Sequence, residues 1–302
     1  MLSILIPIYN FDCRTLVYDL HQQATACGIA FEIVCIDDCS EESFRVLHRE
    51  FSNHPNIKYS ELPQNSGRSI IRNKLAREAT YDWLLFMDCD SQTESPNYIR
   101  NYLEAAKEHE VVFGGRSYSA DPPEETSRYF RWKYGSAREV VPYTRRQVHP
   151  YRSFMTNNFL IRKDIFLRIN MDESIKGYGH EDTLFAQELK AGNVPIGHID
   201  NPLRHIGLET AEVFLKQTQN GVMNLLLLIR KGKIDKDNKL FSAFVFLKTF
   251  RLKKIFLKYF LKRKSNWEKQ LLSKNPSLRK FDFYKLGLLT EYEVNLEKEK
   301  IS

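Results

Sequence analysis

Residues 84–92, LLFMDCDSQ, carry an apolar run directly into two acids, Asp88 and Asp90, that are separated by one residue. The run has the length of a buried strand, and its continuous apolar character is typical of a strand that a parallel sheet covers on both faces. Acids in this position either lead the chain into solvent or hold a positively charged partner. The rest of the sequence has to decide between these two interpretations.

Short apolar runs and helical patterns alternate along the first 115 residues. The apolar runs are SILIPIY, FEIVCID, IKYSEL and DWLLFMD, and the expected helices lie near 14–27, 41–52 and 69–79. This alternation predicts a parallel α/β sheet. The α/β pattern continues to about residue 209, and helical patterns predominate from Thr210 onward. A long irregular segment rich in Arg, Tyr and Pro is expected at 117–150.

Polar and aromatic residues follow the expected strands at their carboxyl ends, which is where ligands collect in sheets of this kind. These residues are Pro7, Tyr9, Asn10, Asp37, Asp38, Asn65, Gly67, Arg68, Asp88 and Asp90. Arg68 and Arg72 stand at the start of an expected helix, where they and the N-terminal amides favour a phosphate. The sequence contains no G-x-G-x-x-G fingerprint and no P-loop lysine in the expected context, so a dinucleotide or a hydrolysed triphosphate is not expected.

Charge and cysteine usage narrow the class of protein. The net charge of +7 is unevenly distributed along the chain, because residues 201–302 contain 22 basic and 10 acidic residues. This excess of positive charge predicts that the C-terminal third binds an anionic partner. All five cysteines lie in the first 90 residues without a C-x-x-C spacing, which favours reduced thiols over a zinc site. No signal peptide is recognised, and no apolar run reaches the roughly 18–20 residues of a spanning helix. We therefore expect a protein that is not integral to a membrane.

Seven motifs together resemble a known family. They are SILIPIYN, IVCIDDCS, NSGRSIIRNKLAREA, DWLLFMDCDS, TNNFLIRKDIF, GYGHED and NPLRHIG. Their order and spacing resemble the family 2 glycosyltransferases over roughly the first 208 residues. The resemblance implies the α/β GT-A nucleotide-diphospho-sugar transferase fold, with a mostly parallel central sheet flanked by helices. It also implies transfer of a sugar from a nucleotide donor, often a uridine diphosphate sugar, with inversion at the anomeric carbon and a bound divalent cation.

The resemblance assigns a donor site. Pro7 and Tyr9 would receive the base, Asp38 would hydrogen-bond it, and Asp37 would be a structural partner of Asp38. Arg68, with Arg72 nearby, would face the donor phosphates, and Asp88 would bind the ribose. The full set of donor-site residues is Pro7, Tyr9, Asp38, Asn65, Gly67, Arg68, Arg72 and Asp88.

A cation site is also implied. In such enzymes the second acid of the D-x-D pair binds the metal, which here is Asp90. A carboxylate suits a hard cation such as Mg²⁺ or Mn²⁺, and that cation neutralises a diphosphate leaving group. His205 matches the position at which many relatives supply a histidine to the cation, and an imidazole ligand favours Mn²⁺ over Mg²⁺. A lone histidine is more often structural, so this assignment depends on the resemblance.

GYGHED resembles the G-W-G-x-E-D segment of the family, on the acceptor side. A general base has to remove the proton of the attacking hydroxyl, and the resemblance assigns this role to Asp182, with Glu181 positioning the acceptor or the loop. Tyr178 stands where the family often has Trp and keeps an aromatic platform for a sugar ring. The alternative interpretation is that acids simply suit the N-terminus of a helix. Asn157 and Asn158, with the irregular segment 117–150, would border the acceptor.

The segment 248–264, KTFRLKKIFLKYFLKRK, has eight basic residues and no acidic one. A basic stripe formed by Lys248, Arg251, Lys254, Lys258 and Lys262 is backed by Leu252, Phe256, Tyr259 and Phe260, a pattern that predicts one basic amphipathic helix. Such a helix either lies on an anionic inner leaflet, where the acceptor would be lipid-linked, or packs its aromatic residues on the protein. No recognition motif for nucleic acid is present, so nucleic-acid binding is not expected.

The sequence thus predicts a catalytic part at 1–208 and a basic helical extension at 209–302. The donor half of the catalytic part would be about 1–115 and the acceptor half 116–208. The expected activity is that of a metal-dependent hexosyl- or N-acetylhexosaminyl-transferase acting on a glycan or a lipid-linked acceptor, in synthesis of a cell-surface polysaccharide or glycoconjugate. The protein would be cytoplasmic, free or peripheral on the inner face of the membrane.

Two other functions remain open at this point. One is a non-catalytic module that binds a nucleotide sugar. The other is a phosphohydrolase with an aspartate nucleophile, but such enzymes usually place their D-x-D after the first strand and put Thr or Val two positions beyond the second acid. Here the pair follows the fourth expected strand, and Gln92 occupies that position.

Overall fold

The computed structural model describes residues 1–175, 177–235 and 237–299 of the 302-residue chain. The chain separates into two compact units. Unit 1 comprises Met1–Ser119, Arg138–Ile175 and Glu181–Gly207, and the described residues of unit 2 lie in 120–137, 177–180 and 208–299. Residues 120–137 therefore pack with the C-terminal helices, a grouping that the sequence does not indicate. The functional division at residue 208 stays a prediction.

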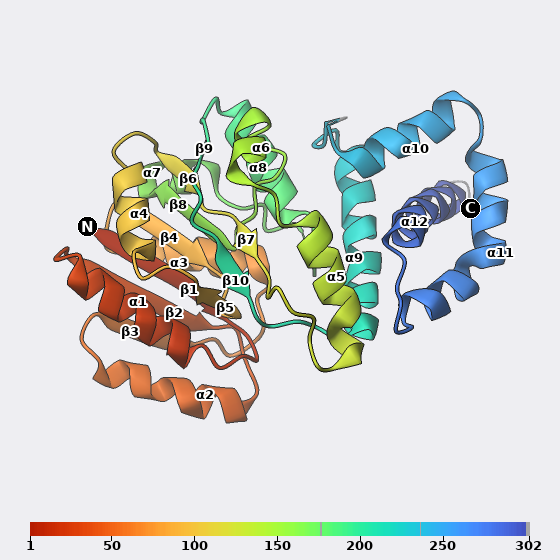
Figure 1. The fold of residues 1–302 in the computed structure, drawn as a ribbon. Coiled ribbons are helices and arrows are strands. Elements are labelled where there is room, and N and C mark those ends of the chain that lie inside the picture. Colours follow the sequence, from red (N-terminus) through yellow and green to blue (C-terminus); the bar gives the residue numbers. More distant parts are fainter. Residues whose placement is uncertain (176, 236, 300–302) are drawn as a thin grey trace. The chain divides into compact units, whose positions relative to one another are not determined.

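A seven-stranded sheet forms the centre of unit 1, in the order β3-β2-β1-β4-β8-β6-β9 (Figure 1). Its strands are β1 (Leu2–Ile8), β2 (Phe31–Asp37), β3 (Ile57–Glu61), β4 (Trp83–Met87), β6 (Val111–Phe113), β8 (Asn158–Arg162) and β9 (Gly197–His198). The first four strands pair in parallel, as predicted, whereas β8 runs antiparallel to both β4 and β6. The sheet is therefore mostly parallel.

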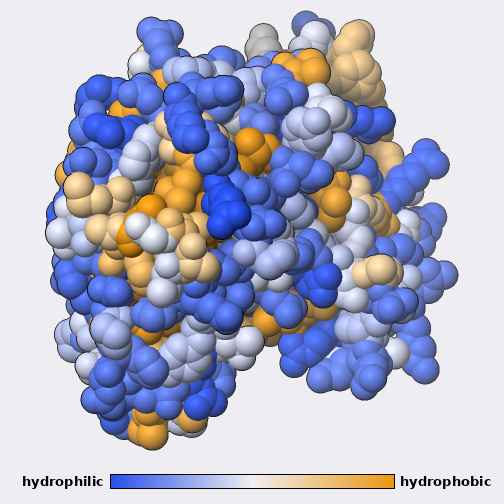
Figure 2. Space-filling model, turned by 60° about the vertical axis from the view of Figure 1, so that its left-hand side comes forward, coloured by the Kyte–Doolittle hydropathy of each residue, from blue (hydrophilic) through white to orange (hydrophobic). Residues whose placement is uncertain are grey.

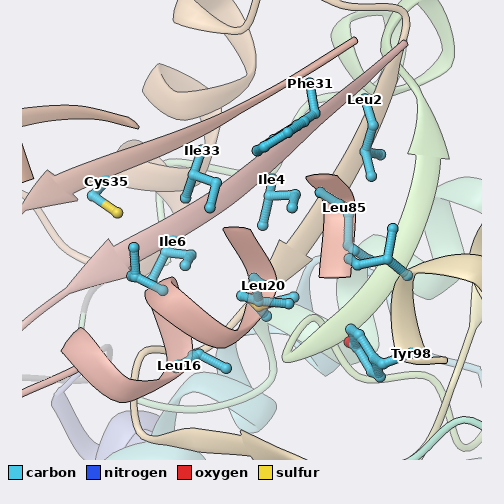
Figure 3. Packing of buried hydrophobic residues seen from close by; sticks show 14 of the residues in the cluster. Leu2, Ile4, Ile6, Leu16, Leu20, Phe31, Ile33, Cys35, Leu85 and Tyr98 are labelled. Atoms are coloured by element: carbon cyan, nitrogen blue, oxygen red, sulfur yellow. The ribbon is translucent and has the colours of Figure 1, made fainter. Parts of the chain in front are cut away.

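Helices cover both faces of this sheet. They are α1 (Arg14–Ala26), α2 (Glu42–His48), the 3₁₀ turn η1 (Arg49–Asn53), α3 (Arg68–Glu78), α4 (Tyr98–Ala105), α6 (Tyr143–Val148), α7 (Lys163–Ile169) and α8 (Glu181–Ala191). Alternate residues of β1 enter different core clusters: Ile4 and Ile6 pack with Leu16 and Leu20 of α1, whereas Leu5 packs with residues of α3 (Figure 3). Burial on both faces explains why the strand is apolar at nearly every position.

A second, three-stranded sheet completes unit 1. It consists of β5 (Ser91–Thr93), β10 (Leu203–His205) and β7 (Arg116–Ser117) in the order β5-β10-β7. β10 runs antiparallel to β5, with His205 opposite Ser91. This pairing brings a segment near the end of unit 1 beside the residues that directly follow the D-x-D pair.

Unit 2 is helical. It contains the 3₁₀ turn η2 (Thr126–Arg128), nearly all of α5 (Tyr129–Arg138), α9 (Ala211–Arg230), α10 (Lys239–Thr249), α11 (Lys253–Leu271) and α12 (Leu278–Glu299). Its core gathers aromatic side chains, among them Phe214, Phe244, Phe260, Trp267 and Tyr284. The predicted C-terminal helical extension is confirmed. The segment 117–150, predicted to be irregular, instead contains α5 and α6.

The prediction of one continuous helix over 248–264 is wrong. α10 ends at Thr249 and α11 begins at Lys253, with Arg251 in the left-handed region at a φ of 56° between them. The Leu252 N–H donates to the carbonyl of Leu247 at 2.9 Å, which closes the C-terminus of α10. Both helices pack on α12, so the chain turns here to bring apolar residues of each helix into the same core.

None of the helices among the described residues combines the length and the apolar character that a bilayer span requires.

Candidate functional site

The carboxyl ends of β2, β1 and β4 lie side by side, because β1 pairs with the other two strands. Tyr9, Asp38 and Asp88 follow these three strand ends. Tyr9 is 53% exposed and therefore accessible to a ligand, while Pro7 is half-buried within β1. Asp38 is fixed to the end of β1 by its N–H, which donates to the carbonyl of Ile8 at 2.8 Å.

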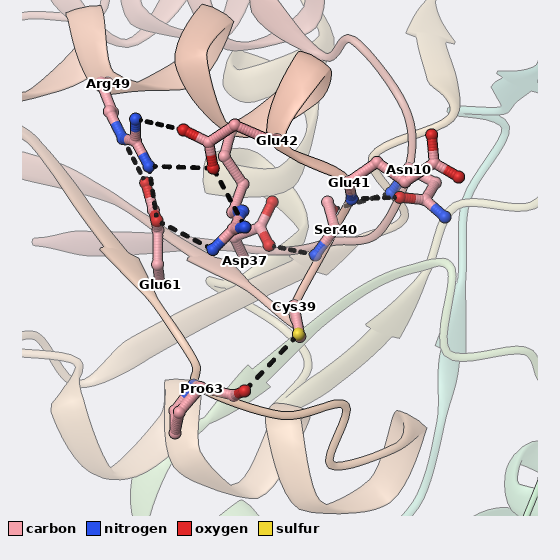
Figure 4. Close-up of polar contacts among 10 residues, drawn as sticks. Asn10, Asp37, Cys39, Ser40, Glu41, Glu42, Arg49, Glu61 and Pro63 are labelled. Atoms are coloured by element: carbon pink, nitrogen blue, oxygen red, sulfur yellow. Dashed lines mark hydrogen bonds and ion pairs between the residues drawn. The ribbon is translucent and has the colours of Figure 1, made fainter.

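Asp37 has a structural role in this region. It is fully buried, and its Oδ1 accepts the N–H of Ser40 at 2.7 Å, which holds the turn after β2 (Figure 4). Asn10, at the end of β1, accepts the N–H of Glu41 at 2.8 Å through its Oδ1. On the outer side of the same region, Arg49 links Glu42 and Glu61. These contacts fix the backbone on which Asp38 is presented.

Asp38 holds the loop that leads into α3. Its Oδ1 accepts the Ser66 N–H at 2.7 Å and the Ser66 hydroxyl at 2.6 Å, and its Oδ2 accepts the Gly67 N–H at 3.0 Å. The Asn65 side chain donates to the Asp38 carbonyl at 3.1 Å. Gly67 has a φ of 90°, a conformation that L side chains rarely adopt, and it brings no side chain to the first turn of α3. Asp38 thus positions the start of α3.

The two arginines of α3 have different surroundings. The Arg68 side chain is partly exposed, and its Nη1 donates to Glu181 Oε1 at 3.2 Å. Arg72 is buried, and its Nη2 lies 2.5 Å from Asp88 Oδ1. Arg72 therefore neutralises the first acid of the D-x-D pair, which the sequence did not indicate. Cys89, between the two acids, is buried in the core cluster that contains Ile4 and Ile6 of β1.

Asp90 lies beside His205, because β5 and β10 are paired. Asp90 Oδ2 is 3.5 Å from His205 Nδ1, and the Asp90 side chain is more exposed than the nearly buried histidine. The main-chain carbonyl of Asp90 accepts the N–H groups of Ile206 and Gly207 at 2.9 and 3.3 Å. A Cβ on Gly207 would lie 2.5 Å from Asp90 Cβ and 2.8 Å from Asp90 Oδ2, so only glycine fits against this carboxylate.

Asp182 lies in the first turn of α8, directly after Glu181. Its Oδ1 accepts the hydroxyl of Thr156 at 2.5 Å. Burial, followed by the neighbouring Glu181 carboxylate, raises the pKa of Asp182 to about 6, while Arg72 acts in the opposite direction. The Asp88 carboxylate also raises this pKa, so the candidate base and the D-x-D pair share one electrostatic environment.

The two asparagines before and in β8 have different roles. Asn158 is fully buried, where it accepts the hydroxyls of Tyr98 and Tyr102 and donates to the carbonyls of Gly115 and Asn201. It is therefore structural and borders no acceptor. The carbonyl of Asn157 accepts the Asp88 N–H at 3.2 Å. Its side-chain oxygen is buried without a hydrogen-bond partner among the described residues.

The structure brings the predicted site residues of unit 1 to one edge of the sheet. Three further residues support the site and were not predicted. The Ser66 hydroxyl hydrogen-bonds to Asp38, the Thr156 hydroxyl hydrogen-bonds to Asp182, and Gly207 leaves the space that the Asp90 side chain occupies. Tyr178 belongs to unit 2, where its carbonyl accepts the Asn224 amide at 3.2 Å. Among the described residues, no group of three or more His, Cys, Asp or Glu side chains is arranged to hold a metal by itself.

The chain matches the family described as Glycosyl transferase family 2 over residues 3–169. It is 32% identical over 142 residues to an uncharacterized glycosyltransferase of Haemophilus influenzae, covering 42% of this chain and 46% of the relative. It is 29% identical over 226 residues to the validoxylamine A glucosyltransferase of Streptomyces hygroscopicus subsp. limoneus, covering 65% of this chain and 49% of the relative. The matches thus span about half the length of these two curated relatives.

Solved structures extend the likeness to the fold. The mannosyltransferase PcManGT from Pyrobaculum calidifontis, in complex with GDP-Man and Mn²⁺, has a TM-score of 0.53 at 14% identity and covers 76% of this chain and 64% of its own. Staphylococcus aureus TarS 1–349 with UDP has a TM-score of 0.50 at 17% identity and covers 99% and 91%. The family match and the shared fold agree that the chain belongs to the family 2 glycosyltransferases and has the GT-A fold.

Proposed function

We propose that this glycosyltransferase moves a sugar from a uridine diphosphate donor to a hydroxyl of a glycan or a lipid-linked acceptor, with inversion at the anomeric carbon. The observation that carries the proposal is the position of Asp182, a partly buried carboxylate whose pKa is raised to about 6 and which shares the environment of Asp88 and Arg72. A carboxylate with this pKa is ionised at neutral pH yet remains basic enough to accept a proton.

The donor would bind across the strand ends. The exposed ring of Tyr9 and the residue Pro7 would receive the base, with Asp38 as its polar partner. Asp38 Oδ2 accepts one hydrogen bond in the structure, and a carboxylate oxygen can accept a second. Arg68 and the first turn of α3 would face the phosphates, and Asp88, held by Arg72, would face the ribose. Asn65 and Gly67 shape the loop between these groups.

Asp90 and His205 fit one divalent cation. Two ligand atoms at about 2.1 Å from one ion, at angles of about 90–110°, lie roughly 3.0–3.5 Å apart. The observed separation of Asp90 Oδ2 and His205 Nδ1 is 3.5 Å. These two residues would hold Mn²⁺ or Mg²⁺ on the donor side of the site. Bound there, the cation would neutralise charge on the departing diphosphate.

The reacting proton and electrons would move through residues of this chain and the substrates. Asp182 would accept the proton of the acceptor hydroxyl as the oxygen forms a bond to the anomeric carbon, and the bond from that carbon to the diphosphate oxygen would break with its electrons. Thr156 would fix the orientation of the Asp182 carboxylate. Glu181, bound to Arg68, would tie the start of α8 to the phosphate side of the site.

We also propose that the enzyme acts in the cytoplasm or on the inner face of the membrane, in synthesis of a cell-surface polysaccharide or glycoconjugate. The support for this location is the basic C-terminal third of the sequence, whose positive charge favours binding to an anionic partner such as a membrane surface. A non-catalytic module that binds a nucleotide sugar is the alternative, and it differs from the enzyme in having no need for Asp182.

A thermal-shift screen would test donor binding. We expect UDP-glucose or UDP-N-acetylglucosamine, with Mn²⁺, to raise the unfolding temperature by a few degrees, because saturation at about 100 times the dissociation constant adds ~2.7 kcal/mol. GDP-mannose serves as the matched donor with a different base. Failure of every nucleotide sugar to shift the unfolding temperature would contradict the proposed donor site.

Substitution of Gly207 should disturb the cation site without removing any ligand. In a Gly207→Ala variant the added Cβ would collide with Asp90 and push its carboxylate away from His205. We expect kcat/KM to fall about tenfold or more, which corresponds to ~1.4 kcal/mol or more of lost transition-state stabilisation. The Mn²⁺ concentration at half-maximal activity should rise.

Gly221→Ala is the matched control, because the nearest atom to its Cβ would be 3.6 Å away, at an ordinary contact distance. Equal Mn²⁺ dependence in the two variants would show that Asp90 does not need the space left by Gly207.

A further inference from the structure

Large exposed hydrophobic side chains are concentrated in one short part of unit 2. Six of the eighteen such side chains among the described residues fall within 246–261, and Ile255 and Phe250 are 70% and 60% exposed. The rings of Phe246 and Phe250 are tilted against each other with centroids 4.5 Å apart, so they form one apolar patch rather than two isolated residues. Hydrophilic residues predominate over much of the face drawn in Figure 2, so large exposed apolar side chains are not the rule on this surface. Clustered exposure of this kind marks an interaction surface.

The spacing along α11 separates an inner face from an outer one. Phe260, Trp267 and Leu271 turn inward and are buried in the helical core. Ile255, Lys258, Tyr259 and Lys262 are exposed and follow at i, i+3, i+4 and i+7, so they share the outer face. We call this set, with Phe246 and Phe250, the α10–α11 face. Its apolar and basic side chains are interleaved.

The basic residues of 248–264 also divide into two groups. Lys248, Lys253 and Lys264 pair with glutamates of α12 and serve the packing of unit 2. The other five have no ion pair with a described residue, and they are Arg251, Lys254, Lys258, Lys262 and Arg263. All five are exposed, and the whole segment has no acidic residue. These charges are therefore available to an anionic partner.

The turn between α10 and α11, residues 250–252, extends the α10–α11 face. Arg251 holds a left-handed conformation, and its neighbours Phe250 and Leu252 are both exposed at this turn. The turn therefore presents one aromatic and one aliphatic side chain on either side of a cation. This is the pattern by which amphipathic segments lie in the interface of a bilayer, with apolar groups among the acyl chains and cations at the head groups.

We propose that the α10–α11 face docks on a membrane surface rich in anionic phospholipid. Charge complementarity favours this partner over a two-fold symmetric contact with a second copy of the chain, in which Lys258 and Lys262 would face the same segment, 248–264, and that segment has no acid. The aliphatic side chains of Ile255, the most exposed apolar residue of the segment, and Leu252 favour acyl chains over nucleic acid, because neither offers a stacking surface for a base. The inference does not depend on the donor or the acceptor, and it places the enzyme where a lipid-linked acceptor would be found.

Vesicle sedimentation with the full chain tests the proposal. We expect binding to vesicles of phosphatidylcholine with phosphatidylglycerol to be at least tenfold tighter than to vesicles of phosphatidylcholine alone, and to weaken with added salt. Lys258→Glu with Lys262→Glu should reduce binding at least tenfold. Ile255→Ser with Tyr259→Ser should reduce it about fivefold or more, at an unfolding temperature close to that of the wild type because these side chains are 70% and 50% exposed.

Lys74→Glu with Lys107→Glu is the matched control, since it makes the same change in net charge on unit 1, in α3 and in the turn after α4, and should leave vesicle binding unchanged. Wild-type binding by the Lys258→Glu, Lys262→Glu variant would overturn the proposal. So would dimerisation in sedimentation velocity that the Ile255→Ser, Tyr259→Ser variant abolishes. Binding to single-stranded RNA as tight as binding to anionic vesicles, and insensitive to the same two serines, would also overturn it.

Discussion

Replacing Asp182 with asparagine is expected to lower the rate of sugar transfer about 10²–10⁴-fold, the range that a general base contributes. The amide cannot take the proton of the acceptor hydroxyl. It keeps the shape of the side chain and an oxygen that can still accept the Thr156 hydroxyl, so the local structure should persist. The transfer rate and the donor dissociation constant should be measured on the same preparation, and donor binding is expected to change little.

The pH dependence provides a second measurement of the same role. A base acts only when it is deprotonated, and the pKa of Asp182 is raised to about 6. We therefore expect kcat/KM of the wild type to rise about tenfold per pH unit below that value and to level off above it. The Asp182→Asn variant should lose this dependence, because the group that titrates is absent.

The unfolding temperature of the Asp182→Asn variant shows whether a lost transfer rate comes from the missing base or from misfolding. The pKa of Asp182 is raised from 3.8 to about 6 on folding, so the folded chain holds the proton more tightly than the unfolded chain and loses stability as the pH rises between these values. The neutral amide avoids that loss, and the variant should unfold at pH 8 at a temperature no lower than that of the wild type.

The matched control for Asp182→Asn is Asp164→Asn, which replaces an exposed carboxylate in the first turn of α7. Full turnover by Asp182→Asn would leave the chain as a binding module in which this carboxylate does no chemistry.

Replacing Asp90 with asparagine is expected to remove the dependence of donor binding on a cation. A neutral amide oxygen is a weaker ligand for Mn²⁺ or Mg²⁺ than a carboxylate, and His205 alone would not hold the ion. Transfer should fall about 10²–10⁴-fold, equivalent to ~3–5 kcal/mol of lost stabilisation of the diphosphate charge.

Calorimetry of UDP binding with and without Mn²⁺ measures this directly. The wild type should bind UDP more tightly when Mn²⁺ is present, and the Asp90→Asn variant should bind equally in both conditions. Asp164→Asn again controls for the loss of one negative charge and should keep the response to Mn²⁺. A variant of Asp90 that retained the full response would exclude this carboxylate as a cation ligand.

Local sequence patterns predicted the main architecture because they depend on burial. Continuous apolar runs such as that of β4 indicate strands covered on both faces, and the residues after them had to reach one edge of the sheet. The same logic could not find Thr156 or Gly207, whose roles come from contacts with Asp182 and Asp90 far away in the sequence. It also could not show that Arg72 pairs with Asp88 instead of standing open to a phosphate.

The C-terminal prediction shows a different limit. The periodicity of 248–264 is helical throughout, so nothing in the local pattern marks the left-handed turn at Arg251. That turn arises because α10 and α11 both bring apolar side chains to the core around α12. The sequence pattern also placed Phe260 and Tyr259 on one apolar face of the helix. In the structure Phe260 is buried and Tyr259 is half exposed.

The position of β8 has a consequence for synthesis on the ribosome. The first 87 residues contain four neighbouring strands, β3-β2-β1-β4, which can pair as soon as they emerge. Strands β6 and β9 cannot join them until residues 158–162 supply the antiparallel strand that links the two halves. Until then β4 is an open edge of apolar residues, the kind of edge that promotes aggregation of nascent chains. His205 follows still later, so the proposed cation site should be among the last parts of unit 1 to mature.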